Sequence, residues 1–122
     1  MSERPDKGRT GPARVARAFA STWSGFRAVW REEEAFRQEC VIALVVIPAG
    51  LWLGHDGVER ALLVTPMLGV LAIELVNSAV EATVDRIGVE RHPLSGLAKD
   101  LGSAAVFVAF VMLRVNWILV LA

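Results

Sequence analysis

The sequence lacks several features that would assign it to common soluble classes. It has one cysteine, Cys40, so no internal disulfide framework can form. Its 13 basic and 13 acidic residues cancel at neutral pH, so it has no charge excess for a polyanion and we expect no nucleic acid partner. The phosphate-binding pattern G-x-x-x-x-G-K-[ST] is absent, as are the H-R-D and D-F-G patterns of protein kinases. Any nucleotide chemistry must therefore use another architecture.

Apolar residues are abundant instead, at 54% of 122 residues, which is high for a soluble domain of this length. Residues 1–39 are polar and lack the apolar core of a cleaved signal sequence. We therefore expect the first apolar run to remain as a membrane helix. Residues 1–12 are rich in Arg, Gly and Pro and are predicted to be a disordered tail, and residues 13–122 to form the functional domain.

Three apolar runs predict an all-α membrane protein with three transmembrane helices. The first run, residues 40–54, carries no charge. Its length corresponds to about 22 Å of helix, less than a hydrocarbon core of about 30 Å, so the helix must begin earlier, between Glu33 and Phe36. Gly88 is the expected stop of the second helix, and Ser95 the expected N-cap of the third. We predict spans at about 34–54, 58–87 and 96–121.

Pro48 and Pro66 lie inside the first two predicted spans, where neighbouring groups can bond to the carbonyl that proline leaves free. Eight of the 13 Lys and Arg residues precede residue 40, where the first apolar run begins, and only Arg60 lies in the loop after that run. By the positive-inside rule, the N-terminus and the 86–99 loop are cytoplasmic and the C-terminus is outside. Arg114, late in the third span, is expected to snorkel toward the outer surface.

An amphipathic pattern precedes the first span. Apolar side chains recur every three or four residues from Val15 to Trp30, and the arginines fall largely on other faces. The pattern predicts a helix over residues 13–31 that lies on the cytoplasmic leaflet. The alternative is an apolar stripe that packs only against the protein's own helices.

Polar residues on one face of the second predicted span carry the most functional information. Glu74 and Glu81 are seven residues apart, so two helical turns place them on the same face. The same face continues through Asn77, Ser78 and Asp85. Ionisable groups inside a membrane are costly, so each indicates a functional site, although such stripes also line ion or proton pathways.

Helical rise places these groups relative to the membrane boundary. Counting from the outer ends of the spans, Glu81 and Glu33 both lie about 30 Å inward, at the cytoplasmic interface, and Glu74 lies about 10 Å deeper in the hydrocarbon. Mg²⁺ is usually held by one or two carboxylates plus substrate phosphates, which suits Glu33 and Glu81. Glu74 is placed to accept a proton from a lipid hydroxyl. Lys99 lies at the interfacial level, where it could contact ATP phosphates or serve as an ordinary interfacial anchor.

Three segments resemble the signatures of prokaryotic diacylglycerol kinase. They are residues 33–39 (EEAFRQE), 74–88 (ELVNSAVEATVDRIG) and 94–105 (LSGLAKDLGSAA). The resemblance extends from about Arg14 to Trp117 without apparent gaps, and the E-x-x-N-S-A-x-E-x-x-x-D block is highly specific. It implies a domain-swapped homotrimer of the bacterial inner membrane, with active sites between subunits. It also implies direct transfer of a phosphoryl group from Mg-ATP to diacylglycerol to give phosphatidic acid.

The resemblance also implies roles for individual positions. The catalytic positions are Glu74, Asn77 and Lys99. The metal ligands are Glu33 and Glu81. The nucleotide-contacting positions are Arg14, Glu33, Glu81, Glu90, Arg91, His92, Lys99 and Asp100. The lipid-contacting positions are Arg14, Ala18, Trp23, Ala35, Gln38, Glu39, Glu74, Ser103 and Trp117.

Two positions depart from the family pattern. Ser21 stands where the best-known members have a tyrosine, which puts an aromatic contact to the nucleotide in doubt, and Arg114 stands where related sequences tend to be apolar. Two other functions stay open. Relatives with the same fold phosphorylate undecaprenol, although the Asn77-Ser78 pair resembles the diacylglycerol enzymes more. A non-enzymatic channel or assembly subunit would use the polar stripe to line a pore.

Overall fold

A computed structural model describes residues 11–122, which form four helices and no strand. The helices are α1 (Pro12–Glu32), α2 (Glu34–Leu53), α3 (Gly57–Ile87) and α4 (Pro93–Leu121). They fall into two compact units, one that contains α1 and one that runs from Glu33 to Ala122. Most of the predicted N-terminal tail, residues 1–10, lies outside the described part of the chain, and Pro12 already begins α1.

The α1 helix carries the predicted amphipathic pattern. Val15, Phe19 and Trp23 follow one another at intervals of four residues and are each more than half exposed. Arg17 and Arg27 fall at other positions around the helix. Exposed aromatic side chains along one face are typical of a helix that lies on a membrane surface.

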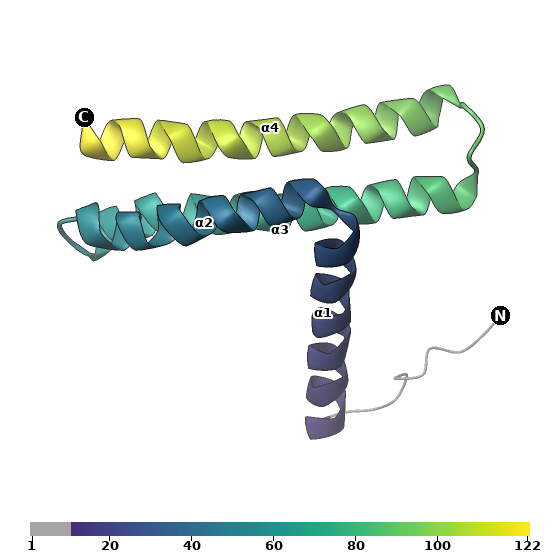
Figure 1. Cartoon of the computed structure of the whole chain (residues 1–122), viewed down its shortest axis with the longest axis horizontal. Helices are drawn as coiled ribbons and strands as arrows, with labels where there is room; N and C mark the ends of the chain where they lie inside the picture. Colours follow the sequence, from purple (N-terminus) through teal and green to yellow (C-terminus); the bar gives the residue numbers. More distant parts are fainter. Residues whose placement is uncertain (1–10) are drawn as a thin grey trace. The chain divides into compact units, whose positions relative to one another are not determined.

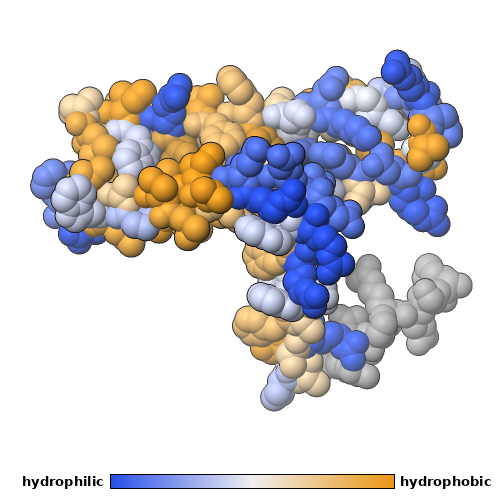
Figure 2. All heavy atoms as spheres, in the orientation of Figure 1, coloured by the Kyte–Doolittle hydropathy of each residue, from blue (hydrophilic) through white to orange (hydrophobic). Residues whose placement is uncertain are grey.

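The second unit contains three helices long and apolar enough to cross a membrane, namely α2, α3 and α4. Figure 1 shows them as neighbouring rods, with α2 and α4 both beside α3. Their shared core is small and centres on Ala43, Met67, Val70 and Ala109. Most large apolar side chains point outward. Figure 2 shows orange apolar atoms along the helices and blue polar atoms gathered where α3 joins α4. A lipid environment explains both features, because outward apolar side chains then need no protein cover.

Pro66 interrupts the backbone hydrogen bonds of α3, and α4 repairs the interruption. Proline has no N–H group, so the carbonyl four residues earlier, that of Leu62, loses its helical donor. Asn116 Nδ2 donates to this oxygen at 3.0 Å, and Trp117 Nε1 donates to the next carbonyl, that of Leu63, at 2.9 Å. The expectation that a neighbouring helix satisfies a carbonyl freed by an intramembrane proline is therefore confirmed at Pro66.

The tight α2–α3 connection is also well satisfied. Asp56 is the N-cap of α3, and its side chain accepts a hydrogen bond of 2.8 Å from the Glu59 amide. Arg60 Nε donates to the carbonyl of Leu51, in the last turn of α2, at 3.0 Å. A side chain at Gly54 would meet the Arg60 backbone nitrogen at 2.9 Å, so only glycine permits this close approach.

The start of α4 differs from the prediction. The helix begins at Pro93 with His92 as its N-cap, so the prediction that Ser95 caps it was wrong. His92 Nδ1 accepts a hydrogen bond of 3.1 Å from the Leu94 amide. Proline is favoured at the first position of a helix because its missing N–H would have no partner there and its backbone angle already suits a helix. Pro93 is therefore the first residue of α4, two residues before Ser95.

Candidate functional site

The polar stripe on α3 changes from buried to exposed toward the 88–92 loop. Glu74 is 6% exposed and Asn77 8% exposed. Glu81 is half-buried, and Asp85 is exposed. Burial by the protein thus decreases along a single face of one helix, from Glu74 toward Asp85.

Asn77 occupies a central position in this stripe. Its Nδ2 donates a hydrogen bond of 3.1 Å to Glu81 Oε1, which fixes the orientation of the carboxylate. Its Oδ1 is buried without a hydrogen-bond partner and points at Gly102 of α4, where a Cβ atom would collide with it. Gly102 therefore provides the space that Asn77 needs. Its role depends on how α4 packs against α3, which the sequence alone does not show.

A second carboxyl group approaches Glu74 from α2. Glu39 is 7% exposed, and its carboxyl group lies close enough to that of Glu74 for the two charges to interact. Each of the two residues also has an Oε2 atom that is buried and has no hydrogen-bond partner. The structure thus concentrates unused acceptor capacity around Glu74, in surroundings where leaving a polar atom unpaired is costly.

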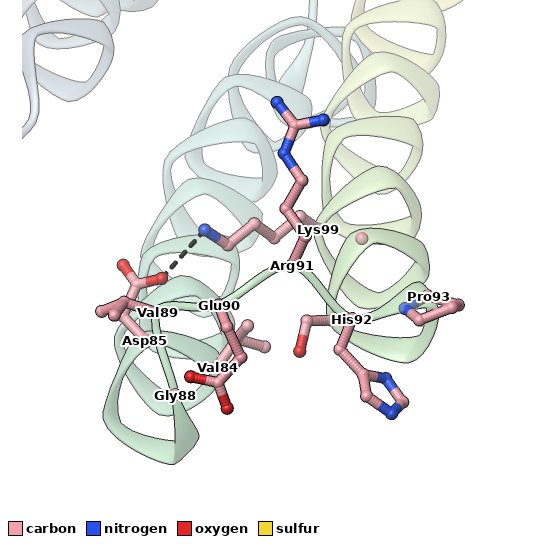
Figure 3. A pocket seen from close by; sticks show the side chains of 11 residues that line it. Val84, Asp85, Gly88, Val89, Glu90, Arg91, His92, Pro93 and Lys99 are labelled. Atoms are coloured by element: carbon pink, nitrogen blue, oxygen red, sulfur yellow. Dashed lines mark hydrogen bonds and ion pairs between the residues drawn. The ribbon is translucent and has the colours of Figure 1, made fainter.

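Lys99 reaches from α4 to α3 at the exposed end of the stripe. Its Nζ forms an ion pair of 2.9 Å with Asp85 Oδ1, and Glu81 is near enough to interact with its charge. The pair edges an open pocket of about 490 Å³ lined by the end of α3, the 88–92 loop and the start of α4. Figure 3 shows the side chains of Arg91 and Lys99 on one side of the loop and those of Glu90 and His92 on the other. The lining thus carries two basic side chains, Arg91 and Lys99, and two acidic ones, Asp85 and Glu90.

The structure brings together some of the predicted site residues. Glu90, Arg91, His92 and Lys99 line the same pocket, while Glu39, Glu74, Asn77 and Glu81 form contacts deeper along the helices. The pocket also includes Ser95 and Gly96, which the sequence interpretation did not assign to a site. Asp85 was recognised as part of the stripe, but its role as the partner of Lys99 required the helix packing.

Other predicted positions lie elsewhere. Trp117 bonds to the Leu63 carbonyl, far along α4 from Lys99, beside a mainly apolar groove of about 350 Å³ that Arg114 also lines. Asp100 and Ser103 are exposed on α4, and Gln38 is exposed on α2. Arg14, Ala18 and Trp23 belong to the separate α1 unit.

The sequence predicts two carboxylates, those of Glu33 and Glu81, as metal ligands. Glu33 is the N-cap residue of α2, and Glu81 is held by Asn77 through one oxygen, so its carboxylate is oriented before any ligand binds. Within residues 11–122 no group of three or more His, Cys, Asp or Glu side chains forms a complete protein cage for a metal. Mg²⁺ characteristically uses one or two carboxylates together with substrate phosphates and water.

These features define a helical membrane protein with a polar site that extends from buried carboxyl groups to an open pocket lined by charged side chains of both signs. Comparison with known proteins adds the family. The sequence model of prokaryotic diacylglycerol kinase matches residues 20–121, and the chain belongs to this family.

Curated relatives cover nearly the whole chain. The diacylglycerol kinase of Pseudomonas aeruginosa strain PAO1 is 48% identical over 121 residues, which cover 99% of this chain and 98% of the relative. That of Escherichia coli strain K12 is 46% identical over 112 residues, or 92% of each protein. The enzyme named diacylglycerol kinase in Haemophilus influenzae is 44% identical over 108 residues, covering 88% of this chain and 92% of the relative.

Proposed function

We propose that the protein transfers the γ-phosphoryl group of ATP to the free hydroxyl of diacylglycerol at the cytoplasmic face of the bacterial inner membrane. The observation that carries the proposal is the buried Glu74 carboxyl group, which has an oxygen without a hydrogen-bond partner, on the same helix face as the residues that approach the Lys99 pocket. The unpaired Glu74 oxygen suits the hydroxyl of a lipid, and the pocket beside Arg91 and Lys99 suits the phosphates of a nucleotide.

Each residue has a defined part in this proposal. Glu74 accepts the proton of the lipid hydroxyl, whose oxygen then attacks the γ-phosphorus directly, without a phosphoenzyme. Lys99 and Arg91 offset charge on the phosphate oxygens from beside the 88–92 loop. Asn77 holds Glu81 in place through its 3.1 Å hydrogen bond. Phosphoryl transfer depends mainly on positioning and charge neutralisation, which these contacts supply.

Mg²⁺ bound with ATP would neutralise phosphate charge, and Glu33 and Glu81 would hold it. Orienting Glu81 through Asn77 before the nucleotide binds limits the rearrangement required. The proposal further places the 88–92 loop in the cytoplasm and the C-terminus outside, and it assembles the chain as a homotrimer with shared active sites. The supporting observations are the distribution of Lys and Arg around the spans and the membership of the family.

The decisive assay uses the purified protein in mixed micelles with radiolabelled ATP and Mg²⁺. Dioleoylglycerol and undecaprenol are offered separately, each at several concentrations. We expect labelled phosphatidic acid from the first lipid and a much lower kcat/KM for the second. Faster labelling of undecaprenol would assign the protein to the other lipid. Absence of labelling from both, in a protein that conducts ions in liposomes, would support the channel alternative.

Two variants test the mechanism and the assembly. Glu74→Gln should lower kcat by about 10²- to 10⁴-fold, the usual contribution of a general base. A Glu74→Gln protein with full activity would rule out Glu74 as the base. Mixing inactive Glu74→Gln and Glu33→Gln chains before reconstitution should restore part of the activity if the two residues act from different subunits. Unchanged inactivity in mixed oligomers confirmed by cross-linking would argue against shared sites.

A further inference from the structure

The Glu39–Glu74 contact raises a question that the general base alone does not answer. Two carboxylates in contact and shielded from water repel each other strongly. A hydrogen bond between two carboxyl groups requires a proton on one of them, because an ionised carboxylate can only accept. The two side chains lie close enough for their charges to interact, and both are more than nine-tenths buried, so a proton held between them would remove the repulsion.

Within the unit from Glu33 to Ala122, the charged group that acts on Glu39 is another carboxyl group. Glu39 lies on α2, which packs against α3, and the charged side chain that meets it there is Glu74. The thiol of Cys40, next along α2, is the other titratable group that senses its charge. On α4, Lys99 is bonded to Asp85. Asn77 is neutral, its Nδ2 donates a hydrogen bond to Glu81, and its Oδ1 is a further acceptor without a partner.

We infer that Glu39 is a positioning residue for Glu74, and that the two carboxyl groups hold one proton between them in the resting enzyme. The protonated carboxyl of Glu39 donates to one oxygen of Glu74 and fixes its orientation. The remaining Glu74 oxygen, buried and without a partner, is left to accept from the substrate. This inference rests on the proposed function, in which Glu74 is the base. It explains how Glu39 keeps the Glu74 carboxylate ionised and oriented toward the substrate.

The proton balance of the reaction follows. The hydroxyl O–H bond of the lipid breaks and its proton passes to Glu74, while the oxygen forms a bond to the γ-phosphorus. The bond from that phosphorus to the bridging oxygen breaks, and its electron pair leaves with ADP. Both carboxyl groups are then neutral, so one proton must pass from the pair to water before the next cycle. The pair therefore alternates between one and two protons.

The test compares the pH dependence of kcat in wild type, Glu39→Gln and Glu39→Ala. In the wild type, kcat should rise with pH as the pair loses its second proton and fall again as it loses the last one, since two adjacent carboxylates would repel and misplace Glu74. The two apparent pKa values of this profile describe the pair of carboxyl groups, not either residue alone. Glutamine keeps an N–H donor but cannot ionise, so Glu39→Gln should stay within about tenfold of the wild-type kcat and lack the alkaline fall. Glu39→Ala, without a donor, should lose on the order of 10²-fold.

Controls separate this inference from its foundation. Glu34→Gln, an exposed carboxylate at the start of α2, should keep the wild-type pH profile. Infrared spectra of the resting protein at neutral pH should contain a protonated carboxyl band that Glu39→Gln lacks. If Glu39→Gln keeps the alkaline fall and the band while Glu74→Gln is inactive, the shared proton is overturned and the proposed base survives. If Glu74→Gln is fully active, the proposed base itself fails.

Discussion

At the end of the bundle near residues 54–56, polar groups of the second unit are paired across the helices, whereas around Glu74 several are not. Asn116, Trp117 and Arg60 each donate to a backbone carbonyl of another helix. Around Glu74, by contrast, three buried acceptor atoms have no hydrogen-bond partner. An unpaired buried polar atom costs about 1–3 kcal/mol, so the region around Glu74 lowers the stability of the fold. We interpret the paired end as the part that holds the helices together. The unpaired acceptor atoms around Glu74 are available to bind a substrate.

The strongest way to test this contrast is to remove the cation at the exposed end of the stripe. Lys99→Met should lower kcat/KM for ATP by roughly 10²- to 10³-fold, the range expected for loss of a group that stabilises developing charge. The unfolding midpoint in detergent should barely change, because the Lys99–Asp85 pair is exposed on both sides. Arg86→Met, one residue beyond Asp85 and outside the pocket lining, is the matched control and should remain near wild type. Equal losses in both variants would refute a specific role for Lys99.

A smaller effect is expected when the space beside Asn77 is filled. In Gly102→Ala the new Cβ collides with Asn77 Oδ1, so the Asn77–Glu81 hydrogen bond should be displaced. We expect kcat to fall by about tenfold or more, since small misplacements in an active site are costly. Gly69→Ala, in the middle of α3 with nothing within 4 Å of the added carbon, should not reduce kcat. Activity in Gly102→Ala equal to that of Gly69→Ala would show that the Asn77 position does not matter.

At the opposite end, substitutions should affect stability and leave the kinetics alone. Asn116→Leu removes the donor to the Leu62 carbonyl and should destabilise the protein by about 1 kcal/mol, with kcat and KM unchanged. In a Pro66→Ala background the helix regains its own donor to Leu62, so the same substitution should cost close to nothing. A double-mutant cycle of unfolding in mixed micelles measures the difference. A cost of Asn116→Leu that is independent of residue 66 would contradict the repair.

The smallest effect is expected at the cap of α3. Asp56→Ala should reduce stability by about 0.5–1 kcal/mol, because the Glu59 amide loses its acceptor. Asp56→Asn keeps a side-chain oxygen and should be nearly neutral. Neither should alter the ATP dependence of the rate. A kinetic defect in Asp56→Ala without loss of stability would contradict the claim that this end affects only stability.

Some of this organisation was predictable from the sequence. The apolar runs predicted the three spans, and the seven-residue interval of Glu74 and Glu81 predicted their common face. The contact between Glu39 and Glu74 was not predictable from periodicity, because it joins two helices and depends on how α2 docks on α3. The position of the Leu62 carbonyl freed by Pro66 does follow from sequence, but its donor, 54 residues away at Asn116, depends on tertiary packing. The start of α4 was misplaced because Ser95 was taken as its N-cap, whereas His92 caps the helix and Pro93 is its first residue.

The hydrogen bond from Asn116 has a mechanical consequence for the distant site. Contacts between the antiparallel α3 and α4 keep one alignment along their length, from Leu62 with Asn116, through Asn77 with Gly102, to Asp85 with Lys99. A shift of a single residue would displace one helix by about 1.5 Å and turn it by about 100°. It would unseat all three contacts together. The carbonyl that Pro66 leaves free therefore helps to fix the register of α4 on α3, and this register places Lys99 beside Asp85.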